Sequence, residues 1–564
     1  MKKIVTLFTI SAALFANVSL FAQDAQGGTP YSFDHQLSDK AIAAVSTPDY
    51  DYNALMALSV QRVKDGTYEL TDKLFDVNFD VNNSGTWTTL DNGDRLWKIK
   101  ITSASAVKMK LYFQNFSLPE GAKLYVYNED RSEEAGAFTS INNEDANLNE
   151  SIISTPHLLG ETQIVEYYEP AVVKGQGRFN IFRVAHQFKS ITSAESCQID
   201  INCPDGTNWQ NEKKGVVRIY VVIGSLAGYC SGSLVNNTAQ DCKKYILTAM
   251  HCALDETTGV ETTAYNQWIF YFNYEKTGCA TGTSSAAHTK TGCTKKAGAN
   301  DGGGSTGSDF LLIEMSSATF PTGVTPYYNG WTKASTVTAG GVGIHHPEGD
   351  VKKISTYTAT PSSTSWGGTV ANTHYQFVWG SGHGSTEPGS SGSPVFNTNH
   401  LIFGHLTGGG SCCVANGCPP GSTGTGPTLP DAYGKVSYDW TSNGTTTAKQ
   451  LKPWLDPTNS GVTTLAGAFL GCSLGINNYS NELAFDIFPN PNNGIFNLSL
   501  KLEQPSDIKI NVLNLLGQTV SSKKISNSMG GTFELDLTAQ PQGIYFVEIT
   551  ANGNTTVRKV NVIK

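Results

Sequence analysis

The chain has 564 residues with a net charge of -9, and only 15% of its residues are charged. This length predicts several domains, each with its own core, and the acidic balance excludes the basic face that a nucleic-acid partner requires. The many glycine, tyrosine and phenylalanine residues are typical of an exported protein rich in β-strands.

The first residues predict a secretory signal peptide. Met-Lys-Lys is followed by an apolar run from Ile4 to about Ala22. A membrane anchor is the alternative, but no stop-transfer flank follows the run, and no later segment is long and apolar enough to span a bilayer. We therefore expect residues 1–22 to be cleaved off and the product to be an exported monomer with no stable membrane span.

Residues 23–189 contain no cysteine and alternate polar and apolar side chains in several segments. The clearest of these are Arg95–Thr102, Val107–Phe113 and Ala122–Tyr127. Such alternation predicts half-buried antiparallel strands, and we expect a small β-sandwich. A domain that follows a signal peptide could be a propeptide or a retained binding module. The propeptide is favoured only if the next region is a protease.

The cysteines are confined to the region after this domain. None of the 11 precedes Cys197, and ten lie between Cys197 and Cys418. In an exported chain this crowding predicts disulfides, and the odd count leaves at least one thiol outside the pairs. A zinc site is the alternative, but the histidines do not have metal-ligand spacing against these cysteines. We expect no metal and no cofactor.

A turn rich in glycine and serine surrounds Ser391. In the segment from Gly389 to Pro394, glycines on both sides of the serine allow backbone angles that are closed to other residues. The turn could therefore aim the N–H groups of Gly389 and Ser391 at one point, which would form an oxyanion hole. Taken alone, the segment is equally typical of a surface loop.

Two upstream motifs supply the partners that a serine nucleophile needs. His251 lies at the end of an apolar strand, and Asp309 stands at the mouth of another. The order His251, Asp309, Ser391 is that of chymotrypsin-type serine proteases. Cys230 and Cys252 could form a disulfide that fixes the loop carrying the histidine.

These residue types are those that the chemistry requires. A serine hydroxyl is a poor nucleophile at neutral pH, so His251 would take its proton and later return it to the leaving amine. Asp309 would hold the tautomer of His251 and stabilise the imidazolium. A core histidine, a strand-capping aspartate and a turn serine are the separate alternatives, but three motifs in this order favour the triad.

Residues 197–470 resemble the bacterial lysyl endopeptidases, a family with the chymotrypsin fold. The motifs that carry the resemblance are Cys197–Cys203, Cys230–Thr238, Leu247–Cys252, Ser308–Leu312, Ile344–Pro347, Trp366–Gly368, Thr386–Pro394 and Asp431–Val436. The resemblance implies an all-β fold with two six-stranded barrels over residues 190–470 and the triad in the cleft between them. It also implies the disulfides Cys197–Cys413, Cys203–Cys279 and Cys230–Cys252.

The resemblance also implies a pocket for lysine. Ser385, six residues before Ser391, cannot neutralise a cation, whereas the family's selectivity residue is matched by Asp431 and its aromatic wall by Trp366. Asp431 could otherwise be a turn residue and Trp366 a core residue. The chain departs from the family at Thr407, where the family has histidine, so we expect the imidazole beside the tryptophan to be lost.

Ser390 indicates how activation proceeds. Many chymotrypsin-type enzymes have an aspartate directly before the nucleophile. After cleavage of the zymogen, this aspartate forms an ion pair with the newly created N-terminal amine. Ser390 cannot form that ion pair. We therefore expect the N-terminal domain to block the enzyme sterically until cleavage between Lys189 and Ser190. His345 and His346 could suggest a metal, but the resemblance places them on a structural strand and loop.

The last part of the chain changes composition after a linker at 471–484. Residues 485–564 contain alternating strands separated by Gly, Asn and Pro, and predict a β-sandwich. The segment resembles the C-terminal sorting domains of the type IX secretion system, which implies that secretion machinery as a partner. A carbohydrate-binding sandwich is the alternative.

The sequence therefore predicts a secreted serine endopeptidase that cuts protein or peptide substrates after lysine by an acyl-enzyme mechanism. Within this class, the alternative is a trypsin-like preference for both Lys and Arg, or an altered preference caused by Thr407. A non-catalytic adhesin on a protease fold would require a defect in the triad, and the sequence contains none.

Overall fold

The computed structural model describes residues 18–19, 25–37, 42–64, 68–191, 194, 196–255, 258–284, 288–368, 370–413, 429–471, 485–514, 517–551 and 554–563. The chain divides into two compact units, residues 1–472 and 473–564, and each is described by itself. Most of the predicted signal peptide and of the linker, together with Cys418 and Cys472, lies outside the described residues.

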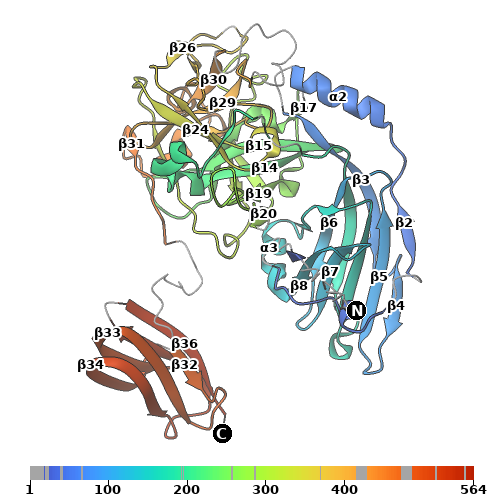
Figure 1. The fold of residues 1–564 in the computed structure, drawn as a ribbon, viewed down its shortest axis with the longest axis vertical. Helices are drawn as coiled ribbons and strands as arrows, with labels where there is room; N and C mark the ends of the chain where they lie inside the picture. The colour runs from blue at the N-terminus through green and yellow to red at the C-terminus, as the bar shows by residue number, and fades with distance from the viewer. Residues whose placement is uncertain are drawn as a thin grey trace, which may run out of the picture. The chain divides into compact units, whose positions relative to one another are not determined.

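The first unit begins with a β-sandwich (Figure 1). One sheet contains β1 (Val18–Ser19), β2 (Ala44–Ser46), β4 (Thr86–Thr89), β5 (Arg95–Thr102), β7 (Lys123–Asn128), β8 (Glu133–Phe138) and β11 (Thr162–Glu169). The facing strands are β3 (Leu70–Asp80), β6 (Lys108–Ser117), β9 (Ile153–Ser154), β10 (Leu158–Leu159) and β12 (Arg178–Gln187). Apolar side chains from both sheets, including Trp97, Leu111 and Val165, form one buried core, as their alternation in the sequence predicts.

The second sheet of the sandwich continues into the region that follows. Strand β3 pairs antiparallel with β15 (Leu226–Leu234), where Lys73 lies opposite Leu226 and Leu70 lies opposite Gly228. The helix α2 (Tyr52–Lys64) precedes β3. Side chains from this segment, including Leu55, join the core of the next barrel. This shared sheet has no sequence signal, because alternation reveals a strand's faces and not the partner at its edge.

A six-stranded ring follows. Its strands are β14 (Val216–Ile223), β15, β16 (Tyr245–Ala249), β22 (Phe310–Met315), β19 (Ile269–Tyr271) and a broken strand made of β20 (Thr289–Thr291) and β21 (Cys293–Gly298). Gly292, with φ of 93°, separates the two halves of the broken strand. Because β20 pairs with β19 and β21 pairs with β22, the ring closes into a barrel.

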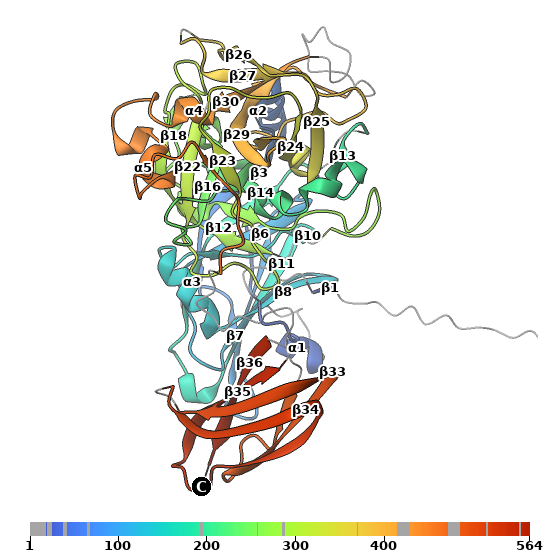
Figure 2. The same ribbon diagram turned by 90° about the vertical axis from the view of Figure 1, so that its left-hand side faces the viewer.

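A second barrel is built from the following strands. Its strands are β24 (Gly341–His345), β25 (Lys353–Tyr357), β26 (Ser362–Thr364), β27 (His374–Phe377), β28 (Pro394–Asn397), β29 (Leu401–Gly409) and β30 (Asp431–Lys435). They lie together at one end of the unit in Figure 2. The backbone of Thr356 bonds to both Gly380 and His383, which brings β25 near the chain that leaves β27. The predicted all-β fold with two barrels is confirmed.

Short elements complete the first unit. They are α1 (Tyr31–Asp34), α3 (Asn143–Leu148), α4 (Val436–Asp439), α5 (Lys452–Leu455), β13 (Ile199–Asp200), β17 (Leu254–Asp255), β18 (Val260–Glu261), β23 (Gly330–Thr332) and β31 (Thr464–Leu465). Val436 and Leu455 belong to a buried cluster that also contains Leu312 and Ile344, and so joins the two barrels. The orientation of one barrel against the other is thus fixed by packing.

The second unit is one five-stranded sheet that bends over its own core. Its strands are β32 (Phe485–Phe488), β33 (Ile495–Leu513), β34 (Thr519–Asp536), β35 (Gly543–Ala551) and β36 (Asn554–Val562). The pairing of β33 with β34 is irregular between Lys501 and Ile508, and side chains from both halves of β33, such as Leu498 and Ile510, are buried together. Across the described residues, no helix is long and apolar enough to cross a membrane.

Candidate active site

His251 and Asp309 meet at one end of the first barrel. His251 lies in the short 3-10 turn Met250–Ala253 after β16, and Asp309 directly precedes β22. These two strands are antiparallel neighbours, with Ala249 opposite Phe310. His251 Nδ1 lies 2.6 Å from Asp309 Oδ2, and the His251 backbone N–H donates to Asp309 Oδ1 at 2.8 Å. The carboxylate therefore holds one residue at two points, which fixes the orientation of the imidazole.

The backbone of Asp309 is held in an uncommon conformation. Its φ is 62°, in the left-handed region that non-glycine residues seldom adopt. Its carbonyl accepts from Met250 N at 2.6 Å, and its N–H donates to Asp301 Oδ2 at 2.9 Å. The two bonds keep the carboxylate, which is 0% exposed, aimed at His251.

The turn that carries Ser391 packs against the strands that lead to His251. The carbonyl of Ser391 accepts from Ser231 N at 2.8 Å, and Cys252 Sγ lies 3.9 Å from the same oxygen. Gly392 has φ of 78°, and a Cβ there would lie 2.1 Å from Thr248 Oγ1. The turn can approach this closely only because that position is glycine.

The two amides expected for an oxyanion hole belong to Gly389 and Ser391. Among the described residues, the N–H groups of Gly389 and Ser391 donate no hydrogen bond. Gly389 has φ of 93°, and a Cβ there would lie 2.9 Å from both His346 O and Gly349 N. A bond from the Ser391 hydroxyl to His251 is not among the contacts of the described residues, and such bonds often tighten only when substrate binds.

The disulfides fix the loops around these residues. The structure contains the three pairs that the resemblance implied: Cys197–Cys413, Cys203–Cys279 and Cys230–Cys252. Cys242 and Cys412 are also disulfide-bonded, and Cys293 is a free buried thiol. The sulfurs of Cys230 and Cys252 gather near His251, but they are bonded to each other and are not thiolate ligands for a metal.

Asp431 is wholly buried at the start of β30 and accepts four hydrogen bonds. Its Oδ2 accepts from Trp379 Nε1 and Thr386 Oγ1 at 2.6 Å and from Ser411 Oγ at 2.7 Å, and its Oδ1 accepts from Ser411 N at 3.2 Å. Burial raises the pKa of Asp431 from its usual value, and the donors from Thr386, Ser411 and Trp379 oppose that shift. All of these donors are neutral. Ser385 reaches Ser411 Oγ at 3.0 Å and so belongs to the same cluster.

Trp366 lies beside the loop that precedes Asp309. A Cβ at Gly304 would lie 3.1 Å from Trp366 Cδ1 and 3.3 Å from His374 Cε1, so the indole and this imidazole border the same glycine. His374 Nε2 is 3.0 Å from Thr407 Oγ1. The imidazole that we expected to be lost with Thr407 is therefore replaced by one from β27. Among the described residues, the hydrogen-bond donors to Asp431 come from Trp379, Thr386 and Ser411 and not from Trp366.

Comparisons with known proteins give the same domain order. Residues 79–188 match the family model described as lysyl endopeptidase N-terminal domain, and residues 191–421 match the lysyl endopeptidase C-terminal domain. A curated lysyl endopeptidase of Pseudomonas aeruginosa is 29% identical over 357 residues, which are 58% of this chain and 72% of that protein. The chain is thus similar to the lysyl endopeptidases over both of these regions.

Residues 486–564 match the family model described as secretion system C-terminal sorting domain. The recognised resemblance is thus confirmed for all three parts, and the protein is a secreted serine endopeptidase. Among solved structures, the protease Anisep from Arthrobacter nicotinovorans is 18% identical and covers 42% of this chain and 97% of its own, with a TM-score of 0.29. A Glu endopeptidase is 15% identical and covers 40% and 87%, with a TM-score of 0.26. TM-scores this low support no conclusion about the function of this chain.

A carboxyl cluster joins the N-terminal region of the endopeptidase to the turn that carries Ser391. Lys189 forms an ion pair with Glu69, which directly precedes β3. Burial, followed by the nearby Glu69 and Glu387, raises the pKa of Glu348 to about 9. The backbone N–H of Glu348 donates to Pro388 O at 2.5 Å, directly before Gly389. The end of the N-terminal region therefore lies near the segment that leads into Gly389.

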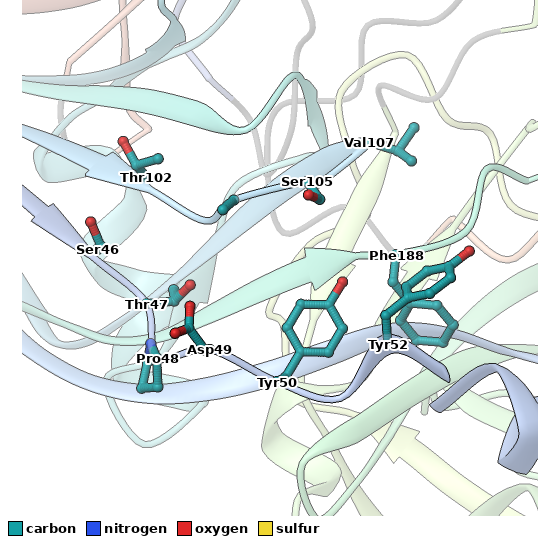
Figure 3. A pocket seen from close by; sticks show the side chains of 11 residues that line it. Ser46, Thr47, Pro48, Asp49, Tyr50, Tyr52, Thr102, Ser105, Val107 and Phe188 are labelled. Atoms are coloured by element: carbon teal, nitrogen blue, oxygen red, sulfur yellow. The ribbon is translucent and has the colours of Figure 1, made fainter. Parts of the chain in front are cut away.

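A hollow of about 780 Å³ lies within the N-terminal region itself. Figure 3 shows Tyr50, Tyr52 and Phe188 on one side of it and Ser46 and Thr47 on the other. All of its lining residues come from positions before Lys189, and neither the candidate triad nor Asp431 is among them.

A polar cluster behind Asp309 was absent from the sequence-based prediction. Asp439 accepts from Ser308 Oγ and lies 2.9 Å from His405 Nε2, and burial raises its pKa. Asp301 accepts from the N–H groups of Asp309 and Gly304. Burial and then the charge of Asp309 raise the pKa of Asp301 to about 6. An acid within a run of glycines, as at Asp301, was the only signal that could have marked this cluster.

Proposed function

We propose that the endopeptidase cuts peptide bonds through an acyl-enzyme in which Ser391 is the nucleophile. His251 takes the hydroxyl proton and returns it to the leaving amine, while Asp309 holds the tautomer with the proton on Nδ1. The observation that carries this proposal is the two-point hold of Asp309 on His251, at 2.6 Å and 2.8 Å. A strand-capping aspartate would not also engage the ring nitrogen.

The negative oxygen of the tetrahedral intermediate is bound by the N–H groups of Gly389 and Ser391. Both are unengaged among the described residues, so an oxyanion can accept from them without displacing a protein acceptor. Each such donor is worth about 10²- to 10³-fold in kcat in serine proteases generally.

The preference at the residue before the cut bond is for lysine. Asp431 accepts only from neutral donors, and no Lys, Arg or His of the described residues forms an ion pair with it. A buried carboxylate without a cation favours a ligand that brings one, because the charge is then paired away from water. The ammonium of a substrate lysine has the required charge, and we assign the aromatic wall for its methylene stem to Trp366.

Two variants test the nucleophile. Ser391→Ala lowers kcat on a fluorogenic lysyl amide by at least about 10⁴-fold, because the acyl-enzyme cannot form. Ser393→Ala, which removes a neighbouring buried hydroxyl, serves as the matched control and stays within a few-fold of the parent. Activity retained by Ser391→Ala would refute the mechanism.

A substrate panel tests the pocket. Peptides that differ only at the residue before the cut, with Lys, Arg, Leu or Glu, give kcat/KM values at least about 100-fold higher for lysine than for leucine. Equal rates on Lys and Arg would replace a lysine preference with a general basic one. Equal rates on Lys, Leu and Glu would remove the role of Asp431 in specificity.

We also infer that residues 23–189 are a propeptide released by cleavage after Lys189. The two endopeptidase family matches end and begin at 188 and 191, on either side of this bond. The Lys189 side chain pairs with Glu69 and not with Asp431, so the bond is cut by another copy or after the segment moves. Residues 190–470 then form the catalytic domain, residues 471–484 the linker, and residues 485–564 the sorting domain.

Processing is tested with inactive chain. Ser391→Ala protein isolated from its own host keeps residues before Ser190, and catalytic amounts of active enzyme convert it, whereas Lys189→Gln resists conversion. A mature N-terminus at Ser190 in the Ser391→Ala protein alone would show that a different protease does the work. Size-exclusion chromatography of the product tests the predicted monomer.

Release of the propeptide depends on pH. The buried carboxyl of Glu348 holds its proton while Glu69 faces it, with a pKa of about 9, and returns to an ordinary pKa near 4.3 when exposed. The docked state binds the extra proton, so docking weakens as pH rises between these values. The dissociation constant of cleaved propeptide therefore increases from pH 6 to pH 9, and Glu348→Gln flattens this dependence. An equally steep dependence in Glu348→Gln would assign it to another group.

A further inference from the structure

A buried chain of hydrogen bonds runs beneath the turn that carries Ser391. His345, the last residue of β24, places its Nδ1 2.8 Å from Ser390 Oγ and its Nε2 3.0 Å from Ser355 Oγ. Ser355 Oγ donates to the carbonyl of Ser385 at 2.9 Å, and the N–H of Glu387 donates to Ser390 Oγ at 3.2 Å. The side chains of His345, Ser355 and Ser390 are each 0% exposed.

The direction of every bond in this chain follows from its last link. A carbonyl only accepts, so the Ser355 hydroxyl uses its proton on Ser385 O and accepts from His345 Nε2–H. His345 Nδ1 is then the bare nitrogen and accepts from the Ser390 hydroxyl. Ser390 Oγ in turn accepts from the N–H of Glu387. Each of the two hydroxyls then donates once and accepts once, and the tautomer of the neutral imidazole that fits carries its proton on Nε2.

The surroundings of His345 keep it in that neutral form. Burial, and then the charge of nearby Lys353, lower the pKa of His345 to about 3. No acid of the described residues forms an ion pair with His345. The imidazole therefore stays neutral over the whole range in which a His251 base could work.

This chain of hydrogen bonds holds both ends of the turn that would form the oxyanion hole. One end is anchored at the carbonyl of Ser385 and the other at the side chain of Ser390, and the N–H of Ser390 also donates to Glu387 O at 2.9 Å. The carbonyl carbon of Ser390 belongs to the same planar peptide as the N–H of Ser391. Fixing Ser390 therefore sets the direction of one of the two oxyanion donors.

We propose that His345 is a positioning residue that sets the oxyanion turn from within the folded chain, before the N-terminal domain is removed. The inference rests on the proposed function, because it takes Gly389 and Ser391 as the oxyanion donors. It assigns to His345 and Ser390 the task that a new N-terminal amine would perform through an aspartate at position 390. The hydrogen bonds of His345 are already present in the uncleaved protein, so cleavage has only to uncover the site.

The test compares two inhibitors on processed enzyme. A peptide aldehyde ending in lysinal forms a hemiacetal with Ser391 and uses the oxyanion donors, whereas n-butylammonium fills only the pocket at Asp431. In His345→Leu, kcat on a lysyl amide falls by about 10²- to 10³-fold and the aldehyde Ki rises in parallel. KM and the butylammonium Ki change by less than about 3-fold, because the pocket is intact.

Conservative variants separate positioning from general support of the fold. His345→Gln regains at least about 10-fold of the lost kcat, because a carboxamide can accept from Ser390 and donate to Ser355 at once. Ser390→Ala, a smaller change, lowers kcat by about 10-fold or more and serves if His345→Leu does not fold. His346→Leu is the matched control, since His346 is equally buried and its Nδ1 bonds to Asp350 O at 2.9 Å, outside the chain.

Different outcomes would refute the positioning role of His345 and the triad mechanism. If Ser391→Ala is inactive but folded His345→Leu and Ser390→Ala keep kcat and aldehyde Ki within 2-fold of the parent, the positioning role is refuted and the triad stands. Equal losses in His345→Leu, His345→Gln and His346→Leu, with a weakened butylammonium Ki, would also refute it and indicate a merely structural role. If Ser391→Ala retains activity, the mechanism fails and the inference fails with it.

Discussion

Asp309 and Asp431 are both wholly buried carboxylates in the same unit, but they are satisfied in opposite ways. Asp309 lies against His251, a group that can become a cation, and engages it through ring and backbone. Asp431 is surrounded by the hydroxyls of Thr386 and Ser411 and by the indole of Trp379. The first has within the chain a partner that can become positive, whereas the second has donors but no cationic partner among the described residues.

The difference separates two uses of buried charge. At Asp309 the partner becomes charged only during the reaction, so the carboxylate stabilises a transient imidazolium and acts on every substrate alike. At Asp431 the missing cation arrives with the substrate, so the carboxylate discriminates among substrates. Replacing each aspartate with asparagine removes the charge, keeps the shape, and should therefore produce two different kinetic signatures.

The largest effect is expected at Asp309. Asp309→Asn lowers kcat by about 10⁴-fold on all substrates, because the amide no longer holds the tautomer of His251 or its positive charge. KM changes little, since no substrate contact is lost. The substrate panel measured at pH 8 checks this. A loss confined to lysyl substrates would break the comparison with Asp431.

The next effect is selective. Asp431→Asn lowers kcat/KM on lysyl substrates by about 10²- to 10³-fold, because the ammonium loses its buried counter-charge. Rates on leucyl substrates stay within a few-fold of the parent, since Thr386 and Ser411 can still donate to the remaining carbonyl oxygen. An equal loss on both substrates would indicate that the substitution disturbs the barrel instead of the pocket, and thermal denaturation of the variant checks for this.

The selectivity should also depend on pH. Burial raises the pKa of Asp431 above 3.8, so its charge is lost at a higher pH than for an exposed aspartate. As pH falls through that raised pKa, the carboxyl becomes neutral and KM for lysyl substrates increases, while KM for leucyl substrates does not. In the parent, the ratio of kcat/KM for the lysyl substrate to kcat/KM for the leucyl substrate decreases as the pH is lowered from 8 to 4. It stays flat in Asp431→Asn.

The two carboxylates also differ in how far the sequence could predict their surroundings. His251, Asp309 and Ser391 stand at the ends of apolar segments or in a glycine-rich turn, so local pattern was enough to select them. The partners of Asp431 could not be found in this way. Trp379, Thr386 and Ser411 lie 52, 45 and 20 residues from it, and the barrel alone brings them together.

The fold, like the candidate site, was predictable from the sequence only in part. Alternating segments predicted strands of the N-terminal sandwich, because burial of one face leaves a period of two in the sequence. The two barrels were expected only from the resemblance to the lysyl endopeptidases. The pairing of β3 with β15 was not predictable, since the unpaired backbone of an edge strand has no sequence signal. His345 was noticed in the sequence only as a metal candidate, because its serine partners on β25 and in the turn are ordinary residues.

The smallest expected effect concerns the second carboxyl on the side of Asp309. Asp301 accepts from the N–H groups of Asp309 and Gly304, and no cation among the described residues pairs with it. Burial and then the charge of Asp309 raise its pKa from 3.8 to about 6. The folded chain therefore binds more protons than the unfolded chain between these values. Stability falls as pH rises through this window, by about 3 kcal/mol for the full shift.

Asp301→Asn tests whether a second negative charge beside Asp309 destabilises the folded chain. In the inactive Ser391→Ala background, which prevents self-digestion, urea unfolding at pH 4 and pH 7.5 gives the free energy of unfolding at each pH. The drop between the two pH values is smaller in Asp301→Asn by up to about 3 kcal/mol, because the asparagine side chain does not ionise. Its amide can satisfy only one of the two N–H groups, so stability at pH 4 is lower than in the parent. An unchanged pH dependence would mean that Asp301 ionises as freely as an exposed aspartate and that Asp309 tolerates a second negative charge close by.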